Sequence, residues 1–475
     1  MSKPLDPQLI QRFIDLVGEK NALTSADDLT HYTHENRDIF VGKTPLVLKP
    51  QSTDAVAQII RLANETKTAI VPQGGHTGHA AGGVPDDSGE QIVLSMERMN
   101  RIRDIDLEGN TAIVEAGVIL KSIQLMADEN ERLFPLTLAS EGSCMIGGNI
   151  STNAGGTAVL SYGNTRDMIL GLEVVTATGE IWNGLRRLKK DNTGYDLRDL
   201  FIGAEGTLGI ITAAVIKLFP KPVGRVAAFA GMKTPEAALE LFQIAGNAAG
   251  KSLTGFEFMP QLGIETVQKF AHSIKNPLQC KHQWYVLMEI SSGRSQVDAT
   301  ELAEEILGKA VDTGAIEDAV VSQNESQRDA FWTIRETMPS SQKLLGGSVK
   351  NDISVPVHQV PTFLKQADAA VTGIMAGARL FSFGHMGDGN IHYNISQPEN
   401  LSTEEFLAER EALNAVVNKV VLLLNGSISA EHGIGKLKRQ LLTETKSSVE
   451  MQMMRAIKQA LDPNGIMNPG KVVQV

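Results

Sequence analysis

Two histidines stand on either side of a short polar turn in the segment FSFGHMGDGNIHYNIS. His385 precedes and His392 follows the run Gly-Asp-Gly-Asn, which is typical of a tight turn between two strands. Folding this segment into a hairpin brings the two imidazoles to neighbouring positions. Because side chains two apart on a strand share a face, His392 and Asn394 point to one side and the apolar residues beside them to the other. We therefore expect a polar site on one face of a hairpin.

A third group with suitable chemistry lies in SISAEHGIGK, where Glu431 precedes His432. Two histidines and one carboxylate with an open position are the composition of a catalytic zinc site or a related divalent-metal site. The residues leave two alternatives open. The histidines could be structural members of the hairpin, or the metal could activate water in a hydrolase instead of assisting a redox reaction.

Glycine-rich loops form a second group with a chemical meaning. The segments IVPQGGHTGHAAGG (70–83) and EGSCMIGGNISTNAGG (141–156) leave backbone N–H groups free to approach an anion, and AEGTLGIIT (204–212) places a turn before a strand. None of them has the GxGxxG or GxxxxGK[ST] spacing of the common nucleotide-binding loops. Two such loops in one domain favour a dinucleotide ligand over simple turns.

The motifs PQGGxTG, SCxIGGNxSTNAGG and GAEGTLGIIT resemble the FAD-binding domain of the vanillyl-alcohol oxidase and p-cresol methylhydroxylase superfamily, over residues 43–222. The resemblance implies two α/β subdomains that hold an extended FAD. Carried over by position, the cofactor contacts are Pro72, Gln73, Gly74, Gly75, His76, Thr77, Gly78, Glu141, Gly142, Ser143, Gly147, Gly148, Asn149, Thr152, Gly155, Glu205, Gly206, Ile210 and Asn468. His76 differs from the residue that is usual at this position in the superfamily. A covalent link between the flavin and His76 is therefore an alternative to the favoured non-covalent FAD.

The second half of the chain resembles the D-2-hydroxyglutarate and D-lactate dehydrogenase branch of that superfamily. The resemblance is carried by GHMGDGNIHYN, SAEHGIGKLK, KNDISVP and LDPNGIMNPGK, and covers most of residues 223–475. It implies that His385, His392 and Glu431 bind zinc or another divalent metal. It also implies that His432 is the catalytic base and that the substrate contacts are Arg335, Lys350, Asn394 and His432.

The implied reaction is the oxidation of a small D-2-hydroxy acid to the 2-oxo acid, with hydride passing from C2 to flavin N5. D-2-hydroxyglutarate is the first candidate, with D-lactate, glycolate and an O₂-using oxidase as alternatives. Pro339 replaces a hydroxyl residue of some relatives, so the contact to a distal carboxylate is not carried over. The implied electron acceptor is an electron-transfer flavoprotein or a quinone.

The elements that must position these groups predict an α+β protein. Short apolar runs alternate with helical patterns in a two-subdomain FAD-binding domain of the p-cresol methylhydroxylase type (1–222). After PKPVG, the segments RVAAFAGM, SLTGFEFM, HQWYVLMEIS, RLFSFGH and IHYNIS have strand patterns and are separated by helical patterns. They predict a substrate domain (223–420), an antiparallel sheet with helices on one face. Residues 421–475 are expected to complete the active site and return to the FAD domain.

Composition limits the partners. The net charge of −11 over 475 residues argues against binding to nucleic acid. Only two cysteines, Cys144 and Cys280, are present, which fits a reducing compartment, and no apolar run reaches membrane-spanning length. We therefore expect a cytoplasmic protein without an integral membrane segment. The oligomeric state stays open, a homodimer included.

Overall fold

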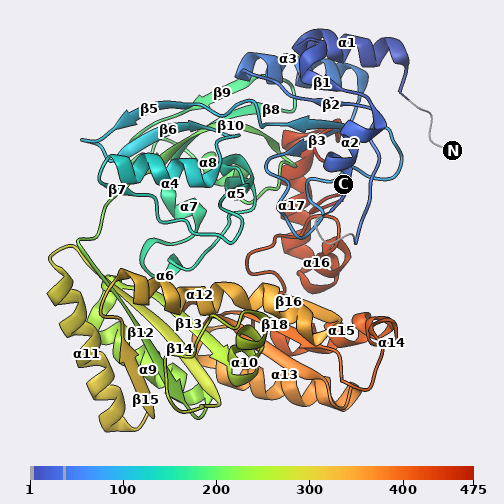
Figure 1. Cartoon of the computed structure of the whole chain (residues 1–475). Helices are drawn as coiled ribbons and strands as arrows, with labels where there is room; N and C mark the ends of the chain where they lie inside the picture. The colour runs from blue at the N-terminus through green and yellow to red at the C-terminus, as the bar shows by residue number, and fades with distance from the viewer. Residues whose placement is uncertain (1–4, 36–38, 475) are drawn as a thin grey trace. The chain divides into compact units, whose positions relative to one another are not determined.

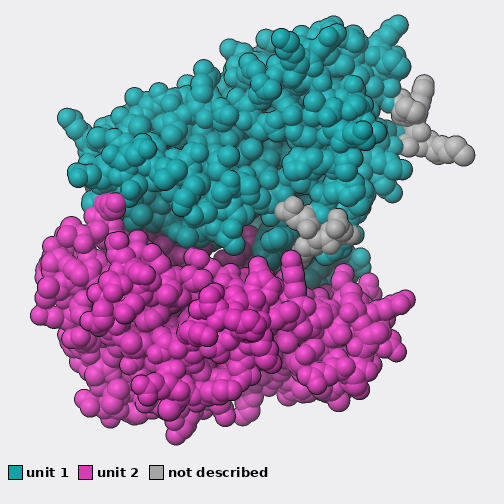
Figure 2. Space-filling model, in the orientation of Figure 1, with its two compact units in different colours: residues 1–155, 164–220, 432–475 teal, residues 156–163, 221–431 magenta. Residues whose placement is uncertain are grey.

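The computed structural model describes residues 5–35 and 39–474. Two compact units divide the chain: unit 1 comprises Met1–Gly155, Asn164–Pro220 and His432–Val475, and unit 2 comprises Gly156–Gly163 and Lys221–Glu431 (Figure 2). The domain limits expected from the sequence stay a proposal, since they divide the chain by function and the units divide it by packing.

The first part of unit 1 is a small sheet in the order β1-β2-β4-β3, in which β2, β4 and β3 run parallel (Figure 1). Its strands are β1 (Ala22–Leu23), β2 (Val47–Leu48), β3 (Ile70–Gln73) and β4 (Ile92–Ser95). Its helical segments are α1 (Pro7–Val17), η1 (Glu19–Asn21), α2 (Ala26–Thr33) and α3 (Thr53–Thr66). Helix α3 begins where the Ser52 hydroxyl accepts the Ala55 N–H, and it buries an apolar stripe at helical spacing: Val56, Ile59, Ile60 and Ala63.

The second part of unit 1 is an antiparallel sheet in the order β5-β6-β10-β8-β9. Its strands are β5 (Ile102–Asp106), β6 (Thr111–Glu115), β8 (Ile169–Thr176), β9 (Ile181–Gly184) and β10 (Gly209–Lys217), with a separate pair of β7 (Arg132–Leu133) and β11 (Phe219–Pro220). Its helices are α4 (Leu120–Glu129), α5 (Ile146–Ser151), α7 (Thr165–Met168) and α8 (Arg198–Phe201). The central strand β10 is buried along nearly its whole length, which explains its continuous apolar sequence GIITAAVI.

The C-terminal segment folds onto unit 1, with α16 (Arg439–Thr445) and α17 (Ser448–Leu461). Met467 forms a parallel bridge with Ile70, and both side chains lie in the core beneath the first sheet. The buried ammonium of Lys458 donates to Thr207 O and Met467 O, both at 2.7 Å, and to the Asp462 carboxylate at 2.5 Å. This ion pair therefore holds the tail against the turn that precedes β10.

Replacing Lys458 with Met is expected to lower the free energy of unfolding by about 3 kcal/mol, because Asp462 stays buried without its counter-charge. Urea unfolding measures the change. Lys446→Met is the matched control, since Lys446 and Glu450 form an ion pair of the same spacing on the surface, where water screens it and its loss should change the stability far less. Equal effects of the two substitutions would contradict a role for the buried pair.

Unit 2 contains a seven-stranded antiparallel sheet in the order β15-β12-β14-β13-β17-β18-β16. The strands are β12 (Gly224–Met232), β13 (Leu253–Pro260), β14 (Trp284–Ser292), β15 (Asp318–Val321), β16 (Ser348–Ser354), β17 (Arg379–His385) and β18 (Asn390–Ser396). The α-helices are α6 (Val159–Tyr162), α9 (Pro235–Ala249), α10 (Gln261–Phe270), α11 (Gln296–Thr313), α12 (Glu325–Ser341), α13 (Val360–Ile374), α14 (Thr403–Ala408) and α15 (Arg410–Leu423). The short 3₁₀ turns are η2 (Gly250–Ser252), η3 (Gln342–Leu345), η4 (Val357–Gln359) and η5 (Met386–Asp388).

Helices pack on both faces of this sheet. Alternate residues of β12 point to opposite cores: Val226 and Ala228 lie with α9, α11, α13 and α15, whereas Ala227 and Phe229 lie with α10 and α12. The α+β fold class is confirmed, with one correction of detail. Helices were expected on one face only, but α10 and α12 add a smaller layer on the other, because β12 to β14 are apolar on both sides. Among the described residues, no helix is both long and apolar enough to cross a membrane.

Candidate active site

A cavity in unit 1 lies where two of the glycine-rich loops meet. It has an empty volume of about 1040 Å³, its open mouth included. A Cβ atom built on Gly75 would lie 2.1 Å from Ser143 O, and one on Gly74 would lie 3.5 Å from Gly148 N. The loop after β3 can therefore approach the segment around α5 this closely only with glycine at position 75. The arrangement exposes backbone at the cavity wall, as an anionic ligand requires.

Most residues expected to contact FAD line this cavity. They are Pro72, Gln73, Gly74, Gly75, His76, Thr77, Gly78, Gly147, Gly148, Asn149, Thr152, Glu205, Gly206 and Ile210. Five expected residues do not line it: Glu141, Gly142, Ser143, Gly155 and Asn468. The Glu141 carboxylate instead accepts hydrogen bonds from Lys121 Nζ and Gln124 Nε2, both at 2.9 Å. The Asn468 amide donates to Gly82 O and Glu205 O, so it supports the lining from behind.

Two hydrogen-bond acceptors in the cavity wall indicate what kind of ligand the cavity binds. Gln73 Oε1 and Asn149 Oδ1 are buried and have no hydrogen-bond partner within the described part of the chain. A buried acceptor without a donor is costly, so a bound molecule with N–H or O–H groups is expected to supply one. The hydroxyls and the ring N–H of a flavin nucleotide fit this requirement. FAD would therefore be held by the three glycine-rich segments.

His76 lies in the cavity wall with a left-handed backbone, at φ +57°. Its Nε2 atom is in hydrogen-bond contact with the backbone oxygen of His34. Burial lowers the pKa of His76, although the bond to His34 opposes this shift. The ring is therefore neutral near pH 7, and the covalent link to flavin stays an open alternative.

Glu205, which lines the cavity as expected, also forms hydrogen bonds that the sequence did not predict. Its two carboxylate oxygens accept the N–H groups of Ile434 and Gly435, each at 2.7 Å. Burial raises the pKa of this carboxyl, while the two N–H groups partly offset the rise. His432, two residues earlier, lines the same cavity and packs edge-on against His79, with ring centroids 4.8 Å apart. Glu205 thus ties the segment that carries His432 to the wall of the flavin cavity.

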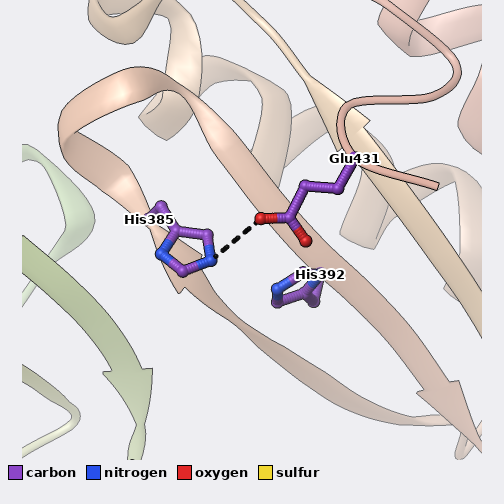
Figure 3. A group of neighbouring side chains, drawn as sticks. All are labelled: His385, His392 and Glu431. Carbon is purple, nitrogen blue, oxygen red and sulfur yellow. Dashed lines mark ion pairs between the residues drawn. The ribbon is translucent and has the colours of Figure 1, made fainter. Parts of the chain in front are cut away.

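In unit 2 the predicted hairpin is present. Strands β17 and β18 pair antiparallel around η5, and Gly389 takes a left-handed backbone at φ +82°. The face assignment is also confirmed, since Ile391 and Tyr393 lie in the helical core on the side away from His392. One ligand atom each of His385, His392 and Glu431 lies within 4.8 Å of the others (Figure 3). The structure thus brings the three expected metal ligands together.

The separation of His385 and Glu431 fits two ligands of one metal ion. His385 Nε2 lies 3.4 Å from Glu431 Oε1. Two ligand atoms at about 2.0–2.1 Å from one zinc ion, at the tetrahedral angle, are themselves about 3.4 Å apart. All three side chains point toward one another from β17, β18 and the segment after α15 (Figure 3). The donor set of two imidazoles and a carboxylate is also the one that zinc accepts.

Charge in the cluster is set by its neighbours. Burial disfavours the charged form of His385, but Glu257 and then Glu431 outweigh it and raise the pKa of this histidine well above its usual value. Burial lowers the pKa of His392, although Glu431 opposes the shift. Burial would raise the pKa of Glu431, yet the contact with His385 lowers it. Glu431 is therefore ionised at neutral pH, as a metal ligand must be.

Two buried carboxylates behind the ligands were missed by sequence reasoning. Glu257 on β13 lies 2.7 Å from His385 Nδ1 and accepts a hydrogen bond of 2.7 Å from Arg335 Nε. Burial opposes ionisation of Glu257, but His385 and Arg335 hold its pKa at about 2. Asp352 on β16 accepts the Glu431 N–H at 2.8 Å and lies 3.8 Å from His392 Nδ1. Each expected ligand therefore has a carboxylate partner outside the cluster.

Unit 2 contains three of the four expected substrate contacts, and the fourth, His432, belongs to unit 1. Lys350 is exposed on β16, directly opposite Asn394 on β18. The Asn394 amide is buried and donates to Gln342 Oε1 at 3.0 Å. Arg335 is only 6% exposed, and its guanidinium lies 4.7 Å from the centre of the Phe383 ring. The positive and amide groups expected to bind the substrate thus lie on β16, on β18 and on α12.

Comparison with known families agrees with this architecture. The family described as "FAD linked oxidases, C-terminal domain" matches residues 221–472, and the family described as "FAD binding domain" matches residues 44–184. The expected FAD cofactor and the expected FAD-dependent oxidoreductase class are thereby confirmed.

Relatives of known name match nearly the whole chain. A D-2-hydroxyglutarate dehydrogenase of Stutzerimonas stutzeri is 37% identical, over 98% of this chain and 99% of its own. A D-2-hydroxyglutarate–pyruvate transhydrogenase of Saccharomyces cerevisiae is 36% identical, over 99% of this chain and 95% of its own. The mitochondrial D-2-hydroxyglutarate dehydrogenase of Arabidopsis thaliana is 34% identical, over 99% of this chain and 82% of its own.

Solved structures confirm the fold expected from the motifs. p-Cresol methylhydroxylase with bound substrate matches with a TM-score of 0.76 at 18% identity, covering 98% of this chain and 96% of that one. An alkyldihydroxyacetonephosphate synthase matches with a TM-score of 0.74 at 18% identity, covering 99% and 86%. The family matches and the full-length relatives of 34–37% identity, together with this fold, show that the chain belongs to the FAD-linked oxidase family, in the branch that contains the D-2-hydroxyglutarate dehydrogenases.

Proposed function

We propose that this protein oxidises a small D-2-hydroxy acid to the 2-oxo acid, using FAD and a divalent metal ion, with D-2-hydroxyglutarate as the first candidate substrate. The observation that carries the proposal is the convergence of His385, His392 and Glu431 in a chain that also has a flavin cavity. The names of the relatives from Stutzerimonas stutzeri and Saccharomyces cerevisiae support the same substrate.

When bound, FAD would accept the hydride from C2, and a divalent ion held by His385, His392 and Glu431 would lower the pKa of the substrate hydroxyl. The chain supplies the base and the binding groups. His432 directly follows the ligand Glu431 in sequence, and its neutral imidazole accepts the hydroxyl proton. Removing this proton lets the electron pair on oxygen form the carbonyl as hydride leaves.

Positive side chains account for binding an anion to an acidic protein. Arg335 presents a planar fork that suits the C1 carboxylate, and Lys350 adds an exposed point charge. The Asn394 side chain fixes the substrate's orientation beside them. Pro339 is exposed one helical turn after Arg335 and offers no hydrogen-bond donor. A distal carboxylate, if the substrate carries one, is therefore bound by a group other than residue 339.

Three alternatives follow from the same residues. D-lactate or glycolate lacks a distal carboxylate, which suits the absence of a donor at Pro339. An O₂-using oxidase needs the same site and differs in access of oxygen to the flavin. A metal hydrolase uses the histidine cluster but leaves the flavin cavity without a role.

A cytoplasmic location is also part of the proposal, although the Arabidopsis thaliana relative is mitochondrial.

The decisive experiment is an anaerobic visible spectrum of the purified protein before and after each acid is added. We expect D-2-hydroxyglutarate to bleach the flavin band and its L-enantiomer to leave it unchanged, because hydride transfer needs C2 in one orientation. D-lactate and glycolate are tested in separate cuvettes. Bleaching by none of these acids would refute the proposed function.

The reduced protein then identifies the acceptor. Return of the flavin band with O₂ indicates an oxidase, and return with an electron-transfer flavoprotein or a quinone indicates a dehydrogenase. Pyruvate is included because the relative from Saccharomyces cerevisiae is a transhydrogenase. Precipitating the protein with acid separates the two flavin alternatives, since FAD linked through His76 would stay with the pellet.

A further inference from the structure

Glu257 is the only charged residue of β13, whose sequence is LTGFEFMP, and its side chain is fully buried. Its neighbours Phe256 and Phe258 point to the helical core on the other face of the sheet. Strand β13 pairs with β17 through Phe258 and Gly384, so Glu257 comes directly opposite His385. An acid in this position is costly to bury, and its two oxygens reach two different functional side chains.

We propose that Glu257 is a positioning residue that joins the metal ligand His385 to the substrate-binding side chain Arg335. The proposal rests on the proposed function, which assigns those two roles. It adds that one carboxylate orients both groups, so a change at position 257 alters metal affinity and substrate binding together.

The contact with His385 selects the ring tautomer. Glu257 Oε1 lies 2.7 Å from His385 Nδ1, and an ionised carboxylate only accepts hydrogen bonds, so Nδ1 carries the proton. The lone pair of the neutral ring is then on Nε2, the atom 3.4 Å from Glu431 Oε1. A carboxylate on the far nitrogen of a ligating histidine orients the ring and increases its basicity.

The contact with Arg335 fixes the plane of the guanidinium. Nε donates to Glu257 Oε2 at 2.7 Å, and the group stacks at 4.7 Å over the Phe383 ring. Within the described residues, no hydrogen bond or ion pair is formed by the two terminal nitrogens. The edge that suits a carboxylate is therefore kept available, in an orientation set by Glu257 and Phe383.

A purely structural role is the competing explanation, and the same sheet provides a control for it. Glu289 lies on β14 on the same face as Glu257, and it is also buried. Its carboxylate accepts from Arg225 Nη2 at 3.0 Å and from Trp332 Nε1 at 2.8 Å. Among the described residues, its carboxylate forms no hydrogen bond with the expected metal ligands His385, His392 and Glu431. Glu289→Gln therefore removes a buried carboxylate charge without touching the cluster.

The experiment measures Zn²⁺ binding to the metal-depleted, FAD-loaded protein by competition with a chromogenic chelator. We expect Glu257→Gln to weaken binding by about 10- to 100-fold, the usual effect of losing such a partner, while Glu289→Gln stays within about twofold of the parent. KM for the acid should also rise in Glu257→Gln, because the Arg335 plane is no longer held. Unchanged Zn²⁺ affinity in folded Glu257→Gln would overturn the proposal.

Two further arms keep the result interpretable. Glu257→Asp retains the charge but withdraws it by one carbon, so an intermediate Zn²⁺ affinity is expected. This variant decides the question if Glu257→Gln does not purify with FAD. Zn²⁺ titration needs no turnover, so a parent protein that binds Zn²⁺ but oxidises no acid would refute the proposed function and leave the role of Glu257 toward His385 measurable.

Discussion

Replacing His432 with Ala is expected to lower kcat by about 10²- to 10⁴-fold while FAD stays bound, because the substitution removes the proposed proton acceptor. His432 is one residue of the cavity wall, and the glycine-rich segments that form most of that wall are unchanged in sequence. The loss should appear in kcat and in kcat/KM alike, as it does when an interaction is made only in the transition state. Anaerobic stopped-flow reduction of the flavin measures it directly.

His79→Ala is the matched control for this experiment. The His79 ring packs edge-on against His432 at 4.8 Å, but His79 is not part of the cavity wall. Its removal changes the packing around the base without removing the base, so a decrease of less than about tenfold is expected. Flavin reduction at the parental rate in His432→Ala would mean that another group takes the proton.

The local parts of this site could be predicted from the sequence. Alternation along IHYNI separates the polar face of β18 from its core face, and the Gly-Asp-Gly-Asn run specifies the hairpin turn. Both patterns span only a few residues, so they can be recognised without knowledge of the rest of the fold. Closely spaced glycines likewise indicated which loops expose backbone to a ligand, and most of them line the cavity.

The carboxylates behind the ligands depend on strand order, which no local pattern encodes. Glu257 is 128 residues from His385 in the chain and meets it only because β13 pairs with β17. A signal was available, since a single acid between two phenylalanines in an apolar strand is costly unless it has a partner. The sequence could therefore have marked Glu257 as unusual, although it could not have named His385 or Arg335 as the partners.

Strand recognition failed at both edges of the large sheet. The edge strands β15 (Asp318–Val321) and β16 (Ser348–Ser354) were not expected as strands. Edge strands pair on one side only, so they carry less apolar sequence than central ones, and SVKNDIS has few of the residues typical of a buried strand. Because β16 was not expected, Asp352 was not predicted as part of the site. The pairing of β16 with β18 places it opposite His392.

Removing the metal is expected to abolish flavin reduction by the acid and to leave the spectrum of the bound flavin unchanged. The ligands His385, His392 and Glu431 belong to unit 2, whereas the flavin cavity is lined by residues of unit 1, so the chelator need not release FAD. Dialysis against a chelator, followed by readdition of Zn²⁺, Mn²⁺ or Co²⁺ singly, also identifies the ions that restore activity. Full activity of protein shown to be metal-free would refute the metal-dependent reaction.

Substituting a ligand tests the same mechanism with a defined pH dependence. His392→Ala should lose metal and activity together, because two remaining ligands bind a divalent ion weakly. In the parent protein, Glu257 and Glu431 raise the pKa of His385 against the effect of burial, so this ring is protonated in the metal-free state at neutral pH. Metal must displace that proton to reach Nε2, and its affinity is therefore expected to rise with pH and fall as the solution is acidified. Proton release on adding Zn²⁺ to metal-free protein in weak buffer measures the displacement, and binding without proton uptake or release at any pH would show that His385 is not a ligand.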